Sequence, residues 1–313
     1  MRIVVGALVA VLLALLAWPG PGWAAPPSED ELAAPAVGAQ AVAVVDVDSG
    51  GLLYGVNAHE HRAQASLTKM MTALVAVEHW KLDDPIVATK RSLVEPAVIG
   101  MEPGDRLPLR DALYGLLLNS GNDAALAIAE TVGEGSISRF VGWMNLDAVR
   151  LGLKDTHFVN PHGLDAEDHY SSAYDVALLG RALLKDRFLA EVVATPRYVV
   201  PGPPEWVFHN LNPLLGKVDG VDGLKTGYET NAGHCLAVSA TREGHQLIVV
   251  VMDDDDYARD SAALVEWGFA TFRWWQVRVP SPQTGRIEPT TIVLREDQAR
   301  SLPVLAEMAR RGA

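Results

Sequence analysis

The chain has 313 residues, and 26 basic against 39 acidic side chains give it a net charge of −13. This acidic balance argues against nucleic-acid binding, which requires a basic surface, and it supplies no polybasic patch for an anionic membrane. The single cysteine, Cys235, excludes an intramolecular disulfide, and its apolar, strand-like setting predicts a buried thiol without a catalytic role.

The N-terminal residues are typical of an export signal. Arg2 precedes an apolar run over residues 3–18, and helix-breaking Pro and Gly residues then lead to the small residue Ala24. We expect a cleaved signal peptide over residues 1–24, because the apolar run is short for a membrane span; an uncleaved membrane anchor is the alternative. Residues 25–37 are polar and rich in Pro and Ala, which predicts a flexible lead-in.

The remaining chain predicts strands, then helices, then strands again. Residues 41–47 and 52–56 are short β-like runs around an Asp-Ser-Gly-Gly turn, which indicates a hairpin. Helical patterns follow over residues 66–78, 109–130, 136–151 and 172–185. After Val218 we expect three strands at hairpin spacing, a helix over residues 258–274, a strand over residues 290–294 and a last short helix. If the first hairpin joins the later strands, one antiparallel sheet results, covered by helices and interrupted by a helical insertion.

A serine and a lysine one helical turn apart form the first candidate site. Ser66 begins the helical pattern of residues 66–78, where a serine often caps the first turn, and Lys69 follows three residues later. Positions i and i+3 share one face of a helix, so the hydroxyl and the amine can meet. Taken alone, the S-x-x-K spacing favours a capping serine and a lysine that extends its amine to solvent.

Two further polar clusters stand where local rules disfavour them. Residues 120–122, Ser-Gly-Asn, interrupt an apolar helical pattern, which predicts two helices that meet at a tight turn. Residues 225–227, Lys-Thr-Gly, lie in the later β region. Each cluster alone is ordinary. Together and in this order, the three match the S-x-x-K, S-D-N and K-T-G set known from penicillin-binding proteins and class A β-lactamases.

The chain resembles the D-alanyl-D-alanine carboxypeptidases, the low-molecular-weight penicillin-binding proteins of serine peptidase family S11. Besides the three clusters, the stretches ASLTKMMTALVAVE, LYGLLLNSGNDAALAIAE and VDGLKTGYETNAGHCLAVSA are similar to that family's sequence blocks. The resemblance covers residues 38–275 as a catalytic domain. It implies an α/β (α+β) penicillin-binding-protein and β-lactamase-like fold, with an antiparallel five-stranded sheet flanked by helices and an all-helical subdomain. Residues 276–313 are expected to form a short tail without a full β domain.

The resemblance also implies a serine acyl-enzyme mechanism. A serine hydroxyl needs an adjacent base, and burial together with a second cation, Lys225, would keep the amine of Lys69 neutral. Ser66 is then the nucleophile, Lys69 the general base and Ser120 a proton relay. Asn122 binds the substrate amide or positions Lys69.

Substrate binding is assigned to the Lys-Thr-Gly cluster and its neighbour. Lys225 and Thr226 would hold the substrate carboxylate, and Gly227 would let the substrate peptide approach the strand edge as an added strand. The backbone N–H groups of Ser66 and Tyr228 would form the oxyanion hole.

The implied function is removal of the terminal D-alanine from peptidoglycan stem pentapeptides. Stem peptides would be substrates and β-lactams covalent inhibitors, in the periplasm or at the cell wall, either free or membrane-associated. Two positions depart from the family: Glu229, where many relatives have threonine, and Leu211, near which some carboxypeptidases have arginine. These departures and the missing β domain raise the alternative of a D,D-endopeptidase that cuts cross-links. A non-catalytic penicillin-fold protein that binds the wall is the alternative from another class, and the Ser-Gly-Asn turn disfavours a class A β-lactamase.

No metal or cofactor is expected. His157, His162 and His169 lack the H-E-x-x-H spacing of a zinc site and are predicted to be loop or hydrogen-bonding residues. The acidic run over residues 253–256 lacks the alternating ligands of a calcium loop and is predicted to be solvated. The two tryptophans at 274–275 are expected to pack rather than bind.

Overall fold

The computed structural model describes residues 33–94, 96–280, 286–295 and 297–298. The signal peptide predicted over residues 1–24 lies outside them. Two compact units divide the chain, a large one over Pro35–Glu266 and a small one that includes the residues from Trp267 onward. Within the described residues, no helix is both long and apolar enough to cross a membrane.

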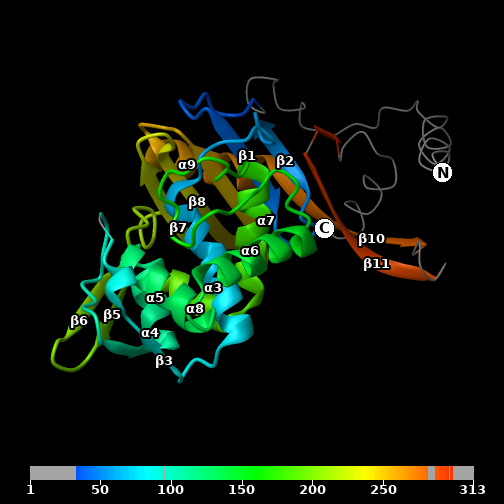
Figure 1. Cartoon of the computed structure of the whole chain (residues 1–313). Helices are drawn as coiled ribbons and strands as arrows, with labels where there is room; N and C mark the ends of the chain where they lie inside the picture. The colour runs from blue at the N-terminus through cyan, green and yellow to red at the C-terminus, as the bar shows by residue number, and fades with distance from the viewer. Residues whose placement is uncertain (1–32, 95, 281–285, 296, 299–313) are drawn as a thin grey trace, which may run out of the picture. The chain divides into compact units, whose positions relative to one another are not determined.

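A five-stranded antiparallel sheet forms the centre of the large unit, in the order β2-β1-β9-β8-β7 (Figure 1). Its strands are β1 (Ala41–Asp46), β2 (Leu52–Val56), β7 (Val221–Glu229), β8 (Gly233–Arg242) and β9 (His245–Met252). The N-terminal hairpin therefore joins the three later strands, and the helical residues are inserted between β2 and β7, which confirms the expected topology.

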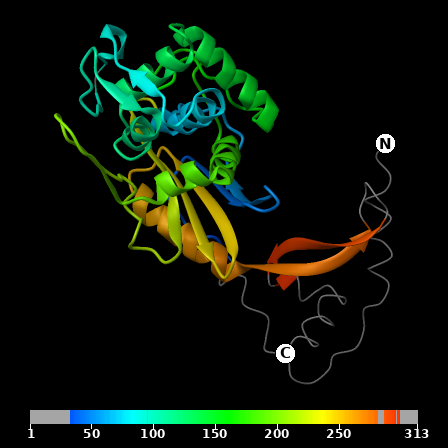
Figure 2. The ribbon, with the colours of Figure 1, turned by 90° about the horizontal axis from the view of Figure 1, so that it is seen from below.

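Both faces of the sheet are covered, which explains the apolar runs in its strands. All six residues of β1 are buried, as expected for a strand with a helix on each face. Helix α7 (Ala173–Lys185) packs on β1, β8 and β9. The first part of α9 (Tyr257–Thr271) runs along the other face as the orange helix in Figure 2. Strand β7 ends the sheet, so one of its edges is free of strand partners.

The inserted region is mainly helical, and helix α3 lies at its centre. Its elements are η1 (Ala65–Thr68), α3 (Lys69–His79), β3 (Pro85–Val87), η2 (Lys90–Ser92), β4 (Arg106–Pro108), α4 (Leu109–Leu117), α5 (Asn122–Val132), α6 (Ile137–Leu151), α7, α8 (Arg187–Ala194), β5 (Arg197–Val200) and β6 (Trp206–His209). Helix α3 contacts α4, α5, α6 and α7. A helix surrounded in this way must be apolar on most of its surface, as the sequence of α3 is.

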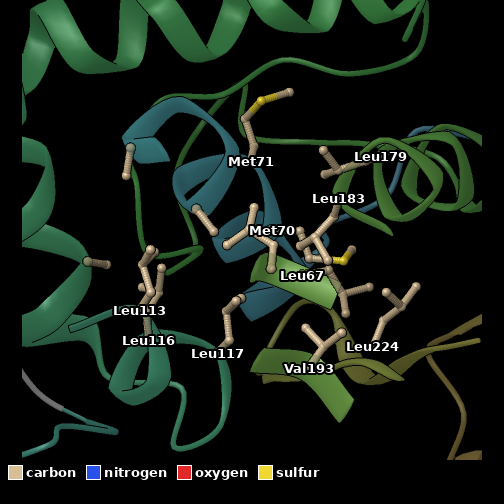
Figure 3. Packing of buried hydrophobic residues seen from close by; sticks show 14 of the residues in the cluster. Leu67, Met70, Met71, Leu113, Leu116, Leu117, Leu179, Leu183, Val193 and Leu224 are labelled. Carbon is tan, nitrogen blue, oxygen red and sulfur yellow. The ribbon is translucent and has the colours of Figure 1, made fainter. Parts of the chain in front are cut away.

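The apolar core extends from this helix to the sheet (Figure 3). Leu67 and Met70 are fully buried between leucines of α4 and α7 and Leu224 of β7. Leu67 belongs to η1, so its burial fixes that turn between the helices and the sheet. The residues on either side of Leu67 are held in place as a consequence.

The expected helices are confirmed, with two kinds of correction. The helix predicted over residues 258–274 ends at Thr271, and Phe272–Pro280 forms strand β10, paired with β11 (Ile287–Arg295). The aromatic and branched residues after Thr271 favour a strand over a further helical turn. Helix α8 and the β5–β6 hairpin had no prediction. The last short helix predicted for the tail lies mainly outside the described residues.

The small unit contains the β10–β11 hairpin. Trp275 packs with Val277, Ile292 and Leu294 in an apolar cluster of its own, and the ring of Trp274 lies 5.8 Å from that of Phe269. Both tryptophans pack, as predicted. The boundaries predicted at residues 38, 275 and 276 stay predictions, since the two units divide at Glu266.

Candidate active site

Ser66 and Lys69 meet at the junction of η1 and α3. The amine Nζ of Lys69 lies 2.7 Å from the hydroxyl Oγ of Ser66. Ser66 is half-buried, whereas Lys69 is fully buried. Neither η1 nor α3 has a side-chain cap, so Ser66 does not cap the helix, and the lysine does not extend to solvent. The capping interpretation of this pair is therefore wrong.

Three oxygen atoms surround the amine of Lys69. Besides Ser66 Oγ, they are Asn122 Oδ1 at 2.7 Å and the main-chain carbonyl of His162 at 2.6 Å. The amide Nδ2 of Asn122 donates to the carbonyl of Pro96, which fixes Oδ1 as the acceptor that faces Lys69. A carbonyl and an amide oxygen can only accept, so a neutral amine donates its two protons to them. Its lone pair then faces the hydroxyl of Ser66.

Burial and a second lysine favour this neutral form. The pKa of Lys69 lies well below its ordinary value of 10.5, mainly because the amine is removed from water and secondly because Lys225 repels its charge. Lys225 is itself buried, and desolvation lowers its pKa to about 7. Its amine donates to the carbonyl of Thr226 at 2.9 Å. The two carboxylates of Glu229 and Asp123 oppose the shift of Lys69 more weakly.

The Ser-Gly-Asn turn brings its residues to the same place. It links α4 to α5, and Ser120 has a positive φ of 63°, a conformation that a non-glycine residue adopts at a cost. Helix α5 begins at Asn122, whose buried side chain reaches Lys69. The turn therefore places Asn122 against Lys69, and Ser120 lines the same pocket as Ser66.

Strand β7 closes the site from the side of the sheet. It packs against η1. A Cβ on Gly227 would lie 3.1 Å from Ala65 Cβ and 3.3 Å from both Gln64 O and Ser66 N. Glycine at this position thus lets the strand approach the turn that carries Ser66. This close approach is to the protein's own chain, and the role of Gly227 in letting substrate approach the strand stays a prediction.

A pocket of about 490 Å³ opens beside Ser66. Its lining contains predicted site residues from all three clusters: Ser66, Ser120, Asn122, Thr226, Gly227 and Tyr228. Lys69 and Lys225 are buried behind this surface. Glu229 and Leu211, the two positions that depart from the family pattern, also line the pocket. The structure therefore brings every predicted site residue to one place, and their roles remain predictions.

Asp123 is a positioning residue that the sequence reasoning missed. Its buried carboxylate accepts the backbone N–H groups of Ile99, Gly100 and Met101 at 2.9–3.1 Å and that of Ala124 at 2.8 Å. This holds the loop whose residues 96 and 97 line the pocket. The sequence feature that could have indicated this role is a carboxylate directly after Ser-Gly-Asn, at the start of an apolar helix.

The histidines near the site are hydrogen-bonding residues, as predicted. His169 Nδ1 accepts the N–H of Val159 at 2.9 Å, so its Nε2 carries the proton and donates to Thr68 Oγ1 at 2.8 Å. Burial, first of all, lowers the pKa of His169 to about 4 and that of His162 to about 3. Both rings are therefore neutral at pH 7. The main-chain carbonyl of His162 accepts a hydrogen bond from Lys69, and the side-chain type of a residue does not predict such a role.

Two remaining predictions concern Cys235 and the acidic run. Cys235 is buried, as predicted, and burial raises the pKa of its thiol to about 12. The prediction of a solvated acidic loop is wrong for Asp254, which is 3 % exposed and whose Oδ1 accepts the N–H of Asp256 at 2.9 Å. Among the described residues, no group of three or more His, Cys, Asp or Glu side chains could hold a metal ion.

Comparison with known proteins identifies the family. The profile of peptidase S11, D-alanyl-D-alanine carboxypeptidase, matches residues 28–256. The D-alanyl-D-alanine carboxypeptidase DacF of Bacillus subtilis is 37% identical over 68% of this chain and 57% of its own length. DacC of Escherichia coli is 37% identical over 78% of this chain and 64% of its own length. This chain therefore spans about three fifths of the length of these curated relatives.

Solved structures agree with the fold. Penicillin-binding protein 6B of Escherichia coli superposes with a TM-score of 0.76 at 33% identity, over 84% of this chain and 86% of that one. A D-alanyl-D-alanine carboxypeptidase of Mycobacterium tuberculosis superposes with a TM-score of 0.72 at 32% identity, over 82% and 97%. The fold is that of the penicillin-binding proteins, as predicted. The chain belongs to the peptidase S11 family of D-alanyl-D-alanine carboxypeptidases.

Proposed function

We propose that this protein is a serine D-alanyl-D-alanine carboxypeptidase that trims the terminal D-alanine from peptidoglycan stem pentapeptides. The observation that carries the proposal is the environment of Lys69. Its buried amine has two acceptor-only neighbours and lies 2.7 Å from Ser66 Oγ. A neutral lysine in this position is a base aimed at a hydroxyl, which is what a serine nucleophile requires.

Acylation begins when Ser66 Oγ attacks the carbonyl carbon between the two D-alanines. The hydroxyl proton passes to Lys69 Nζ as the bond forms. The peptide C–N bond then breaks, and its nitrogen takes up a proton through Ser120, so that the terminal D-alanine leaves as a free amino acid. Water attacks the resulting ester, returns a proton to Ser66 and releases a stem that is one residue shorter.

Binding is assigned to strand β7. Thr226, together with the buried charge of Lys225, would hold the substrate carboxylate. The N–H groups of Ser66 and Tyr228 would donate to the oxyanion that develops at the scissile carbonyl. The free edge of β7 can accept an extended peptide as an added strand. Of the two roles predicted for Asn122, we favour the positioning of Lys69 over binding of the substrate amide, because its Oδ1 already accepts a hydrogen bond from that amine.

Leu211 is the observation that favours the second candidate, a D,D-endopeptidase that cuts cross-links. It is 51 % exposed and lines the pocket, where an arginine would pair with a free terminal carboxylate. Without an arginine there, a stem that ends in D-alanine lacks one partner for its terminal carboxylate. A non-catalytic wall-binding protein is the third candidate, but it gives no reason for a buried lysine beside a serine, a costly arrangement.

The partners follow from the same chemistry. Peptidoglycan stem peptides are the proposed substrates, and β-lactams, which offer Ser66 a reactive amide, are the proposed covalent inhibitors. We infer export by the N-terminal signal peptide, with the enzyme in the periplasm or at the cell wall, free or membrane-associated. The proposal involves no metal, cofactor or nucleic acid.

Fluorescent penicillin labelling tests this function. The protein is incubated with the label, the modified residue is identified by mass spectrometry, and D-alanine release is measured from a stem pentapeptide and a cross-linked dimer. Labelling of Ser66 with D-alanine released from the pentapeptide is the expected result. Labelling with cleavage of the dimer alone would establish the endopeptidase. A folded protein without label would leave the wall-binding candidate.

A further inference from the structure

The pocket beside Ser66 is lined by a carboxylate at one end, and a buried lysine lies behind the other end. Thr226 lines the pocket and Lys225 is buried next to it in β7, whereas Glu229 lies at the C-terminal end of this strand. From Thr226 to Glu229 the strand advances three residues, or about 10 Å. The carboxylate of Glu229 lines the same pocket as Ser66. A ligand that lies along β7 therefore has the buried Lys225 behind one of its ends and the carboxylate of Glu229 at the other.

Glu229 makes no ion pair among the described residues, and only the buried Lys69 attracts its charge from within the site. No arginine, lysine or histidine of the described chain lies within ion-pair distance of its side chain or of Asp165, the carboxylate that repels its charge. Asp165 is held near the end of β7 because its Oδ2 accepts the N–H of Asn231 at 3.1 Å. Glu229 is half-buried, and desolvation, followed by repulsion from Asp165, raises its pKa. A partly buried, unpaired carboxylate gains from an incoming cation.

The direction of the substrate decides which of its residues reaches Glu229. This step depends on the proposed function, which puts the terminal carboxylate at Lys225 and Thr226. The scissile carbonyl then lies beside Ser66, and the chain runs antiparallel to β7 toward Glu229. At about 3.3 Å per residue, the side chain next upstream of the two D-alanines falls at the acidic end.

We propose that Glu229 is a specificity-determining residue that binds an ammonium group on the side chain directly upstream of the two D-alanines. The preferred substrate is thus a stem whose third residue carries a free primary amine. Acylation of that amine, as in a cross-link, removes the charge and the preference. The enzyme then distinguishes free stems from stems whose third residue is already joined to a neighbour.

Three synthetic pentapeptides test this inference with the full chain. They carry lysine, Nε-acetyl-lysine or norleucine at the third position and are otherwise identical. We expect kcat/KM for D-alanine release to be roughly tenfold higher with free lysine than with either neutral residue, the range of a hydrogen-bonded charge pair at a partly exposed site. In Glu229→Gln this ratio falls to about one, since the neutral amide makes no charge pair with the lysine.

Glu167→Gln is the matched control. Glu167 is exposed, lies in the same segment as Asp165 and is not part of the pocket lining, so the same change of charge leaves the ratio unchanged. A Glu229→Gln enzyme that keeps the tenfold preference would overturn the inference. So would a wild type that does not distinguish the three peptides.

Acylation by penicillins separates this inference from the proposed function. If no peptide releases D-alanine, the carboxypeptidase proposal fails, and the rate of Ser66 acylation by aminobenzylpenicillin and benzylpenicillin then tests Glu229 alone. Only the first carries an ammonium group on its side chain. A preference for it that disappears in Glu229→Gln supports the cation site, and equal rates in the wild type contradict it.

Discussion

Replacing Asn122 by aspartate tests whether Lys69 acts as a neutral base. The two side chains have nearly the same shape, but the new carboxylate puts a negative charge 2.7 Å from Lys69 Nζ. At an effective dielectric constant of about 20, the attraction at this distance is about 6 kcal/mol. This attraction would raise the pKa of Lys69 by at most about four. The actual increase is smaller, because the new carboxylate is buried and its desolvation offsets part of the attraction.

The assay is the second-order rate constant for acylation by a fluorescent penicillin, measured from pH 5 to 11. We expect the rising limb of the Asn122→Asp profile to move up by at least about two pH units, with about a hundredfold loss at neutral pH that is recovered in alkali. Asn57→Asp, an exposed turn position, is the control for net charge. An Asn122→Asp profile that is lower everywhere but not displaced would refute the reasoning about the lysine.

Three further changes separate the fold from the site. Gly227→Ala should slow acylation roughly tenfold, because the new methyl group meets the backbone that carries Ser66. Gly142→Ala is the control and should leave the rate unchanged, because its Cβ meets nothing within 4 Å. If the two variants acylate at the same rate, the close approach of β7 to η1 is contradicted. Lys225→Met should abolish acylation yet raise the free energy of unfolding by about 1–4 kcal/mol, measured in urea. The pKa of Lys225 is about 7 in the folded protein, below its ordinary 10.5. Its buried charge therefore destabilises the fold fully below pH 7 and less and less between pH 7 and 10.5, and the gain in Lys225→Met should follow the same course. A gain that does not change with pH would show that the amine is not desolvated. Asp123→Ala should lower the free energy of unfolding by about 3 kcal/mol, because four backbone N–H groups lose their acceptor, and an unchanged urea midpoint would contradict that role.

Much of the site could be predicted because its residues break local rules. A Ser-Gly-Asn inside an apolar helical pattern and a lysine on a buried helix face are both costly, and costs of this kind concentrate at functional sites. The structure brings Ser66, Lys69, Asn122 and Lys225 together as the sequence implied. What the sequence left open was the third acceptor of Lys69, the carbonyl of His162. Every residue carries a main-chain carbonyl, so the residue type does not predict which carbonyl accepts from the lysine.

The errors in the fold have similarly local causes. The end of α9 was misplaced because the residues after Thr271 are apolar and continue the amphipathic pattern, whereas strand pairing with β11 decides their conformation. Asp254 was predicted to be solvated from its acidic neighbours, but the chain buries it at the end of β9.

The pH dependence of Ser66 acylation in the wild type tests the central claim most directly. The claim is that Lys69 is neutral at physiological pH and takes the proton of Ser66. The acylation rate constant should then reach its plateau well below pH 10.5, the ordinary pKa of a lysine. A rate that keeps rising about tenfold per pH unit up to 10.5 would mean that Lys69 is an ordinary ammonium, and the account would be wrong.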